Sequence, residues 1–180
     1  MAHLLLVDDE SNVLKSISRM CWNEKLSPSL GDLRITTFES PFDAIEFAER
    51  QVIDVVVSDF RMPQMNGVAF LTRIRELQPD ATRIIVSAFA DRDGIISAIN
   101  DAGIFRFVTK PWVDLELKGA IGAALVYRQD RLENKRLADA VRHQRGELSA
   151  SELALRRLAV ESPAITRVQW DEDGGVLLEN

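Results

Sequence analysis

The sequence is poor in the residues from which several common sites are built. It contains one cysteine, Cys21, and two histidines, His3 and His143. A single cysteine excludes a disulfide within the chain and is typical of a reducing compartment, so we expect a cytoplasmic protein. With so few histidines, zinc sites and serine–histidine triads have little support. Cys21 falls in an apolar helical stripe, which indicates a core residue rather than a nucleophile.

Long apolar runs are also missing. No stretch approaches the roughly 20 residues that a membrane-spanning helix needs. The start, MAHLLLVDDE, has no basic segment ahead of its apolar residues, so we predict neither membrane insertion nor secretion. The net charge is −6, with acids in excess except in the mildly basic section 128–160. This distribution does not favour direct nucleic-acid binding and instead favours a protein or a small ion as the partner.

What the sequence does contain, up to about residue 125, is a regular alternation of two kinds of segment. Short runs that are apolar throughout alternate with longer segments whose apolar residues recur at helical spacing. The short runs predict strands at 4–7, 34–38, 52–58, 83–87 and 105–109. The amphipathic segments predict helices at 11–25, from 40, at 67–77, at 92–101 and from 113.

Strands that are apolar on both faces are typical of parallel sheets covered by helices on both sides. Five of them in alternation with helices predict an α/β fold, an open doubly wound five-stranded parallel sheet of the flavodoxin-like kind. In such a sheet the ligand site lies beyond the carboxyl ends of the strands. The residues at four of those ends are Asp8 and Asp9, Asp59, Ser87 and Lys110.

These residue types suit one chemistry. Three carboxylates at one edge repel each other unless a cation neutralises them. Mg²⁺ prefers oxygen ligands, and a nearby lysine and hydroxyl bind phosphoryl oxygens. In the stretch VVVSDFRMPQMNG, three valines lead into Asp59 and turn residues follow. Together these groups predict a Mg²⁺-dependent phosphoryl-transfer site with Asp59 as the acceptor.

Each residue alone has a simpler interpretation. A carboxylate after a strand usually caps a helix, which is the simpler account of Asp9. Ser87 alone is more often a capping serine, and Lys110 alone is more often a solvated lysine. Their coincidence at four strand ends favours the site.

The segments LLLVDDE, VVVSDFRMPQMNG, IIVSAFA and FRFVTKPW, in this order, resemble the CheY-like receiver domain of two-component response regulators. The resemblance covers residues 3 to about 125. It implies a bacterial phosphoprotein that accepts a phosphoryl group from a sensor histidine kinase or a phosphotransfer protein and then changes conformation. It also implies no enzymatic activity beyond the chain's own phosphoryl transfer and dephosphorylation.

The resemblance assigns roles at the phosphorylation site. Asp59 would be the phosphoacceptor, and Asp8, Asp9, Asp59 and the backbone carbonyl of Arg61 would bind Mg²⁺. Lys110 would contact the phosphoryl group.

The resemblance also assigns a cis peptide bond and a switch. The bond between Lys110 and Pro111 is usually cis in this family. Ser87 would move toward the phosphoryl group, and Phe107 would rotate inward as it does so. The simpler account of Phe107 is a packed strand aromatic.

The segment after the receiver region predicts a long helix. No proline occurs between Val113 and Pro163, so we expect one helix to about residue 160, roughly 70 Å long. Val141, Leu148 and Leu155 recur every seven residues, which predicts an imperfect coiled coil and a homodimer. The alternative is a solvated helix with scattered leucines.

The last segment, ITRVQWDEDGGVLLEN, alternates polar and apolar residues and contains an Asp-Gly-Gly turn, which predicts a β-hairpin. A lone hairpin is marginal in water, so we expect it to dock on the coiled coil or on its copy in a partner chain; a disordered tail is the alternative. The predicted division is a receiver domain at 1–125, a coiled-coil extension at 126–160 and a hairpin at 161–180.

No helix-turn-helix, P-loop or GGDEF-like signature follows the receiver region, so the output is not recognisable. The chain is then a response regulator that acts by altering protein interactions or dimerisation. Alternatively it is a fragment of a larger regulator of transcription or cyclic-di-nucleotide signalling, or an unphosphorylated scaffold. A phosphatase of the haloacid dehalogenase type is disfavoured, because Arg61 stands where that family needs a second acid.

Overall fold

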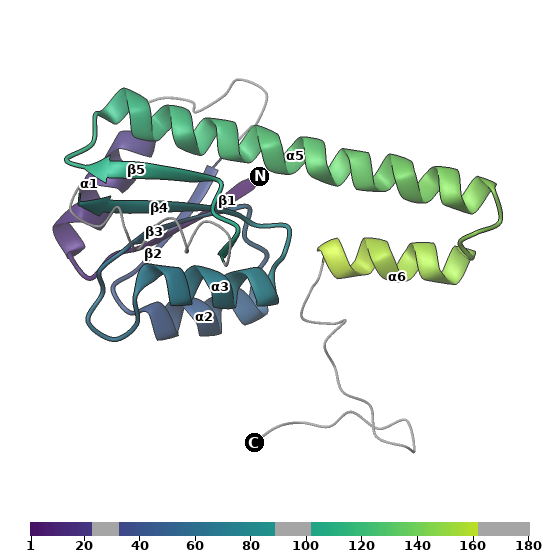
Figure 1. The fold of residues 1–180 in the computed structure, drawn as a ribbon, viewed down its shortest axis with the longest axis horizontal. Helices are drawn as coiled ribbons and strands as arrows, with labels where there is room; N and C mark the ends of the chain where they lie inside the picture. The colour runs from purple at the N-terminus through teal and green to yellow at the C-terminus, as the bar shows by residue number, and fades with distance from the viewer. Residues whose placement is uncertain (23–32, 89–101, 162–180) are drawn as a thin grey trace, which may run out of the picture.

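The computed structural model describes residues 1–22, 33–88 and 102–161. An α/β body carries a helical hairpin that projects from one end (Figure 1). In chain order the elements are β1 (Ala2–Val7), α1 (Ser11–Trp22), β2 (Leu33–Phe38), α2 (Pro41–Arg50), β3 (Val55–Asp59), α3 (Gly67–Leu77), β4 (Thr82–Ala88), β5 (Arg106–Lys110), α5 (Asp114–Gln144) and α6 (Ala150–Glu161).

The five strands form one sheet in the order β2-β1-β3-β4-β5, and every neighbouring pair is parallel. This confirms the predicted doubly wound sheet. Strand β3 begins at Val55, three residues later than predicted. The helix predicted at 92–101, the end of the first predicted helix at 23–25 and the hairpin residues 162–180 lie outside the described residues.

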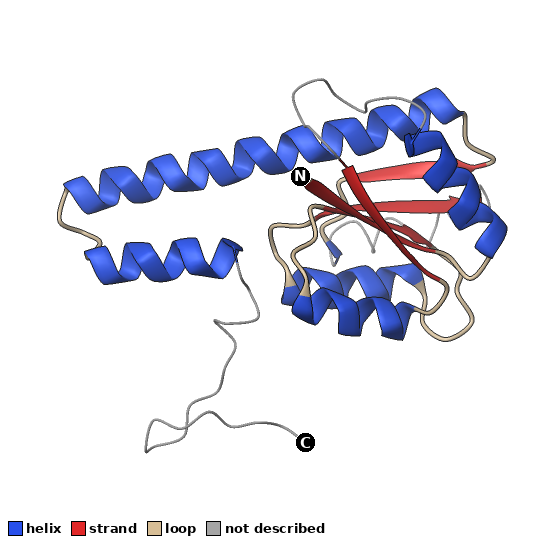
Figure 2. Ribbon diagram, turned by 180° about the vertical axis from the view of Figure 1, so that it is seen from behind, coloured by secondary structure: helices blue, strands red, loops and turns tan. Residues whose placement is uncertain are grey.

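Helices cover both faces of the sheet, as Figures 1 and 2 show. On one face, Leu4 and Leu6 of β1 belong to a buried cluster with α1 and the first part of α5. On the other face, Leu5 and Val7 belong to a second cluster with α2 and α3. Successive side chains of a strand point to opposite faces, which is why these strands are apolar at every position.

The helix starts follow local capping signals. Ser40 caps α2 by accepting a hydrogen bond from the Asp43 N–H, with Pro41 at the first helical position. Asn66 caps α3 by accepting a 2.8 Å hydrogen bond from the Ala69 N–H. The Asn-Gly pair after the Asp59 loop therefore begins a helix as well as making a turn.

The prediction of one continuous helix to about residue 160 is wrong, because α5 ends at Gln144. Gly146 adopts φ +74°, a left-handed conformation that favours glycine. The N–H of Gly146 donates to the His143 carbonyl at 3.0 Å, and the N–H of Glu147 donates to the Arg142 carbonyl at 2.9 Å. This pair of bonds is the Schellman motif that terminates helices. Helix α5 alone is about 45 Å long.

A new helix, α6, begins after the turn and runs back beside α5 (Figure 1). Ser149 and Glu152 form a capping box: the Ser149 N–H donates to the Glu152 carboxylate at 2.8 Å, and the Glu152 N–H donates to the Ser149 hydroxyl at 3.2 Å. The Arg156 guanidinium pairs with Asp139 of α5 at 2.7 Å. Two chains pairing through this extension stays a prediction.

The extension is fixed to the body at the amino-terminal edge of the sheet. Arg128 of α5 pairs with Asp54, and Lys135 pairs with Asp80. The apolar residues of α5 that are buried lie within its first twelve residues and end at Leu125. Within residues 1–22, 33–88 and 102–161, no helix combines the length and the hydropathy needed to cross a membrane.

Candidate functional site

The functional candidates lie at the carboxyl ends of four neighbouring strands. Asp8 directly follows β1, Asp59 is the last residue of β3, and Lys110 is the last residue of β5. Ser87 lies in β4, the strand between β3 and β5, and it pairs in register with Thr109 of β5. Because all four strands are parallel, these ends lie along one edge of the sheet.

Lys110 joins the two aspartates. Its ammonium nitrogen lies 2.8 Å from Asp8 Oδ2 and 2.5 Å from Asp59 Oδ1. The side chains of Asp8 and Asp59 are only 4% and 7% exposed, whereas that of Lys110 is 22% exposed. The two carboxylates are therefore shielded from water, whereas the Lys110 side chain is partly open to solvent.

The pKa values in this cluster reflect burial and an unequal number of charges. Burial raises the pKa of Asp8 above its ordinary value, the Asp59 carboxylate raises it further, and the hydrogen bonds from Lys110 and the Glu10 N–H oppose the shift. Burial alone would lower the pKa of Lys110, but its hydrogen bonds to Asp59 and Asp8 together raise it. Two carboxylates facing one ammonium leave a negative charge, so the site favours a further cation.

Backbone groups hold each carboxylate in place. Asp8 Oδ1 accepts a 2.9 Å hydrogen bond from the Glu10 N–H. Asp59 Oδ2 accepts a 2.6 Å hydrogen bond from the Arg61 N–H. The peptide bond between Lys110 and Pro111 is cis, as the family resemblance implies. Each acidic side chain is thus held both by Lys110 and by the loop that follows its own strand.

Asp9 does not join this group. Its side chain is exposed, one residue beyond the buried Asp8. Within the described part of the chain, no three acidic, histidine or cysteine side chains gather where they could hold a metal ion. The expectation that three carboxylates converge is therefore not met: two converge, and the Lys110 ammonium neutralises part of their charge.

The donor chemistry nevertheless suits Mg²⁺. Asp8 and Asp59 present buried carboxylate oxygens, which are hard ligands of the kind that this ion prefers. The residual negative charge favours a cation, and the exposed Asp9 lies at the rim next to Asp8. The type and the charge of these ligand groups therefore suit Mg²⁺.

The two predicted switch residues differ from each other in burial. The Ser87 side chain is 1% exposed, and its hydroxyl donates to the Ala88 carbonyl at 3.3 Å. Phe107 is half-buried and packs against the second core cluster, on the face of the sheet that α2 and α3 cover. In this conformation Phe107 is a packed strand aromatic.

The sequence interpretation missed the glycine beneath the site. Gly67 N donates to the Phe60 carbonyl at 2.8 Å, and a Cβ atom at residue 67 would lie 2.0 Å from the Asp59 carbonyl oxygen. The loop from Asp59 to Gly67 therefore closes tightly under the carboxylate. The Asn-Gly pair was the available signal, but it was interpreted only as a turn.

The chain matches the response regulator receiver domain over residues 4–122. It belongs to that family. The receiver domain thus accounts for the sheet, for the helices that pack on it, and for the site at its carboxyl edge.

Longer regulators contain similar receiver domains. The hydrogenase transcriptional regulatory protein HoxA of Bradyrhizobium diazoefficiens is 32% identical over 126 residues, which cover 69% of this chain and 24% of HoxA. The transcriptional regulatory protein GlrR of Escherichia coli is 33% identical over 157 residues, which cover 87% of this chain and 32% of GlrR. The chain therefore spans about a quarter to a third of these relatives. The GlrR alignment is long enough that it must extend past the receiver domain into α5 and α6.

Solved structures contain the same fold. The signal receiver domain of an HD domain-containing protein from Pseudomonas fluorescens Pf-5 is 28% identical, with a TM-score of 0.66. The match covers 73% of this chain and 92% of that one. The uncovered part of this chain is about as large as the helical extension and the segment after it.

Proposed function

We propose that this chain is a phosphorelay response regulator in which Asp59 accepts a phosphoryl group from a histidine kinase or a phosphotransfer protein. The observation that carries the proposal is the position of the Lys110 ammonium, 2.8 Å from Asp8 and 2.5 Å from Asp59. An ammonium group between two buried carboxylates is placed to neutralise the phosphoryl oxygens as they arrive.

The transfer is a displacement at phosphorus. A carboxylate oxygen of Asp59 forms the new P–O bond while the P–N bond to the donor histidine breaks, and the released imidazole nitrogen takes up a proton. Lys110 stabilises negative charge on the phosphoryl oxygens, and its ion pair with Asp8 keeps it in reach. The Arg61 N–H orients Asp59 through its 2.6 Å hydrogen bond. Beyond this transfer and the later hydrolysis of its own acyl phosphate, we propose no catalytic activity.

Receiver domains generally use Mg²⁺ at the phosphorylation site, and we propose the same cofactor here. Asp8, Asp9, Asp59 and the backbone carbonyl of Arg61 would hold the ion. When bound, it would neutralise charge between the acids and the phosphoryl group. Support comes from the hard oxygen donors and from the unbalanced negative charge around Lys110.

We further propose that Ser87 and Phe107 form the switch. Ser87 is buried in β4, the strand between those that carry Asp59 and Lys110. A small movement of its hydroxyl toward a phosphoryl group would leave room beside it. Phe107 lies half-buried on the neighbouring strand β5, and it would turn inward into the space that the Ser87 hydroxyl leaves.

For the whole protein we propose regulation through protein contacts. The longer relatives favour a chain that is one part of a larger regulator. HoxA and GlrR are transcriptional regulators, and the similar solved receiver comes from an HD domain-containing protein. A response regulator that acts through its own helical extension is the other form of the same proposal.

The test is phosphorylation by a small-molecule donor. The full chain is incubated with acetyl phosphate and Mg²⁺, and its intact mass is measured. We expect one phosphoryl adduct on the wild type and none on Asp59→Asn. The matched control is Asp54→Asn, at the opposite edge of the sheet, which should keep the adduct. No adduct on the wild type would contradict the proposal and favour a scaffold.

A further inference from the structure

Ser58 is the residue immediately before the proposed phosphoacceptor, and it is a polar residue in an apolar setting. Strand β3 is buried at all five positions, and Ser58 is 0% exposed. Its partners in register are Val7 of β1 and Ile85 of β4, which both belong to the second core cluster. A buried hydroxyl costs free energy unless it forms a hydrogen bond, so Ser58 needs a partner.

That partner is the backbone carbonyl of Asp59, to which the Ser58 hydroxyl donates at 2.8 Å. The register between β1 and β3 ends with Val7 opposite Ser58, so Asp59 lies one residue past the end of this pairing. Among the described residues, no backbone N–H of the loop after β1 donates to the Asp59 carbonyl. The Ser58 hydroxyl therefore takes the place of a backbone donor.

The peptide unit between Asp59 and Phe60 is held at both of its ends. Its carbonyl accepts the hydrogen bond from Ser58, and its N–H donates to the Val86 carbonyl at 2.9 Å. Because a peptide unit is planar, these two hydrogen bonds together fix its orientation. Gly67 packs against the same carbonyl, since a Cβ atom there would lie 2.0 Å from the carbonyl oxygen.

The orientation of this peptide unit bears on the carboxylate. The unit leads directly to the Arg61 N–H, which donates to Asp59 Oδ2 at 2.6 Å. The other carboxylate oxygen, Oδ1, lies 2.5 Å from Lys110 Nζ. A rotation of the Asp59–Phe60 peptide would carry the Arg61 N–H away from Oδ2, and the carboxylate would then lose one of the two contacts that orient it.

We propose that Ser58 is a positioning residue for the phosphoryl acceptor. Its hydroxyl holds the Asp59–Phe60 peptide so that Asp59 keeps one oxygen on Lys110 and the other on the Arg61 N–H. This role rests on the proposed function of Asp59 as the acceptor. The simpler account is a buried serine that satisfies its own hydroxyl and affects stability alone. The two accounts differ in whether the rate of phosphorylation depends on the hydroxyl.

Phosphorylation kinetics of the full chain test this role. Each variant is incubated with acetyl phosphate and Mg²⁺, and the phosphoryl adduct is followed by intact mass. We expect Ser58→Ala to lower the initial rate about tenfold, because small displacements of a reacting group reduce rates strongly. Ser58→Thr keeps a hydroxyl and should retain most of the rate. Ser58→Val has nearly the same shape as Ser58→Thr but no hydroxyl, and it should be as slow as Ser58→Ala.

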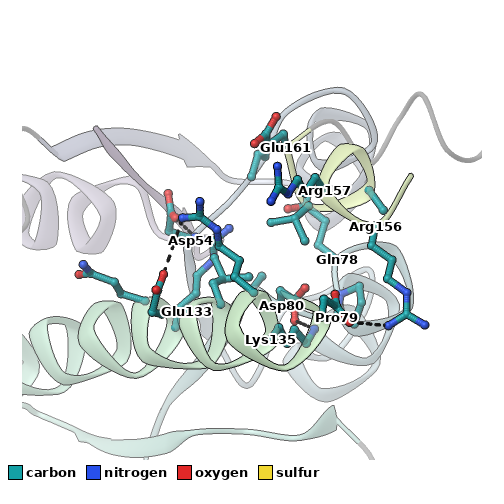
Figure 3. Close-up of a pocket in the computed structure, with 18 of the residues that line it drawn as sticks. Asp54, Gln78, Pro79, Asp80, Glu133, Lys135, Arg156, Arg157 and Glu161 are labelled. Carbon is teal, nitrogen blue, oxygen red and sulfur yellow. Dashed lines mark hydrogen bonds and ion pairs between the residues drawn. The ribbon is translucent and has the colours of Figure 1, made fainter. Parts of the chain in front are cut away.

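Gln78 provides the control for a general loss of stability. Its buried side chain accepts from the Ile53 N–H at 2.8 Å and donates to the Ala48 and Gln51 carbonyls, each at 2.6 Å. It lies at the opposite edge of the sheet, where it lines the groove between α5, α6 and the body (Figure 3). Gln78→Met should lower the urea midpoint at least as much as Ser58→Ala and leave the phosphorylation rate unchanged.

Hydrogen exchange of the Arg61 amide gives a readout that needs no phosphoryl donor. We expect this amide to exchange at least about tenfold faster in Ser58→Ala and Ser58→Val than in the wild type, because its hydrogen bond to Asp59 weakens. Ser58→Thr should retain the slow exchange.

The outcomes separate this role from the proposed function. A wild-type rate in Ser58→Ala would overturn the role while Asp59 stayed the acceptor, and so would a Ser58→Thr variant as slow as Ser58→Val. An equal loss of rate in Gln78→Met would also overturn it, because the loss would then follow stability. No adduct on the wild type would overturn the proposed function and this role with it. A rate lost in Ser58→Ala and Ser58→Val, and retained in Ser58→Thr and Gln78→Met, supports the role.

Discussion

Gly67 illustrates at the scale of one residue how the site depends on backbone packing. A Cβ atom at this position would lie 2.0 Å from the Asp59 carbonyl oxygen and 3.1 Å from the Phe60 Cα. We predict that Gly67→Ala destabilises the protein by about 3 kcal/mol, because the atoms in contact belong to the backbone and cannot move aside cheaply. Urea unfolding monitored by circular dichroism measures the change, and an unchanged midpoint would contradict it.

The protonation of His3 makes the stability of the folded protein depend on pH. Its Nδ1 lies 3.1 Å from the Val52 carbonyl and its Nε2 lies 2.9 Å from the Thr36 hydroxyl. The carbonyl can only accept, so Nδ1 donates and the neutral ring accepts at Nε2. Burial lowers the pKa of His3 below its ordinary value of 6.5, and Arg34 lowers it further, against the effects of Val52 and Asp54.

The sign of the effect follows from this shift. The unfolded chain takes up a proton on His3 as pH falls through about 6.5, whereas the folded chain resists it, so stability is full above that pH and decreases below it. We predict a smaller decrease in His3→Gln than in the wild type. The free energy of unfolding at pH 7.5 and pH 5.5 measures it, and equal pH dependence in both proteins would contradict the assignment.

The sequence was sufficient to predict that Asp8, Asp59 and Lys110 lie together, because the ends of parallel strands meet at one edge wherever those strands lie in the chain. It was not sufficient to predict that the Asp9 side chain is exposed. Consecutive residues after a strand point in directions that depend on the turn, and hydrophobic periodicity carries no information about that turn. The result is a buried Asp8 beside an exposed Asp9.

At the scale of the elements, the helix break was present in the sequence and was not recognised. The prediction of one helix rested on the absence of proline and on the heptad spacing of Val141, Leu148 and Leu155, and it gave no weight to Gly146. The motif Ser149-x-x-Glu152 is a capping box, and together with Gly146 three residues earlier it marks the end of one helix and the start of another. Local capping outweighed long-range periodicity here.

We predict that Gly146→Ala opens the helical hairpin. A residue with a Cβ atom disfavours the left-handed conformation by roughly 1–2 kcal/mol, which shifts the turn toward continuous helix. Small-angle scattering should then show a larger maximum dimension. The control is Gly119→Ala, inside α5, where the added carbon would have no atom within 4 Å apart from its chain neighbours and the adjacent backbone of the helix. It should leave the dimension unchanged and stabilise the protein by about 0.5–1 kcal/mol.

At the scale of the whole molecule, the outer face of α5 is the candidate for pairing. Val126, Leu137 and Val141 are 41%, 56% and 45% exposed. Their spacing places them on one stripe of the helix, opposite to Arg128 and Lys135, which pair with the body. A coiled-coil dimer, if it forms through this stripe, is confined to α5 because the chain turns back at Gly146.

We predict that the chain is a dimer in solution and that Leu137→Glu with Val141→Glu makes it a monomer. Burying two glutamates opposite their copies would place like charges together. Light scattering should give twice the 20.2 kDa chain mass for the wild type and that mass for the variant. Leu155→Glu, on α6, is the control and should stay dimeric. A monomeric wild type would contradict the prediction.

Helix α5 starts at the edge of the sheet that carries Asp59 and extends past the opposite edge, where Arg128 and Lys135 are paired with the body (Figure 1). A donor protein that binds over the Asp59 carboxylate would therefore lie at one end of the molecule. The α5–α6 hairpin projects from the opposite end. Under the proposed function, phosphorylation at Asp59 and output through the hairpin would therefore not compete for space, and one molecule would accept a phosphoryl group from its donor while still bound to its target.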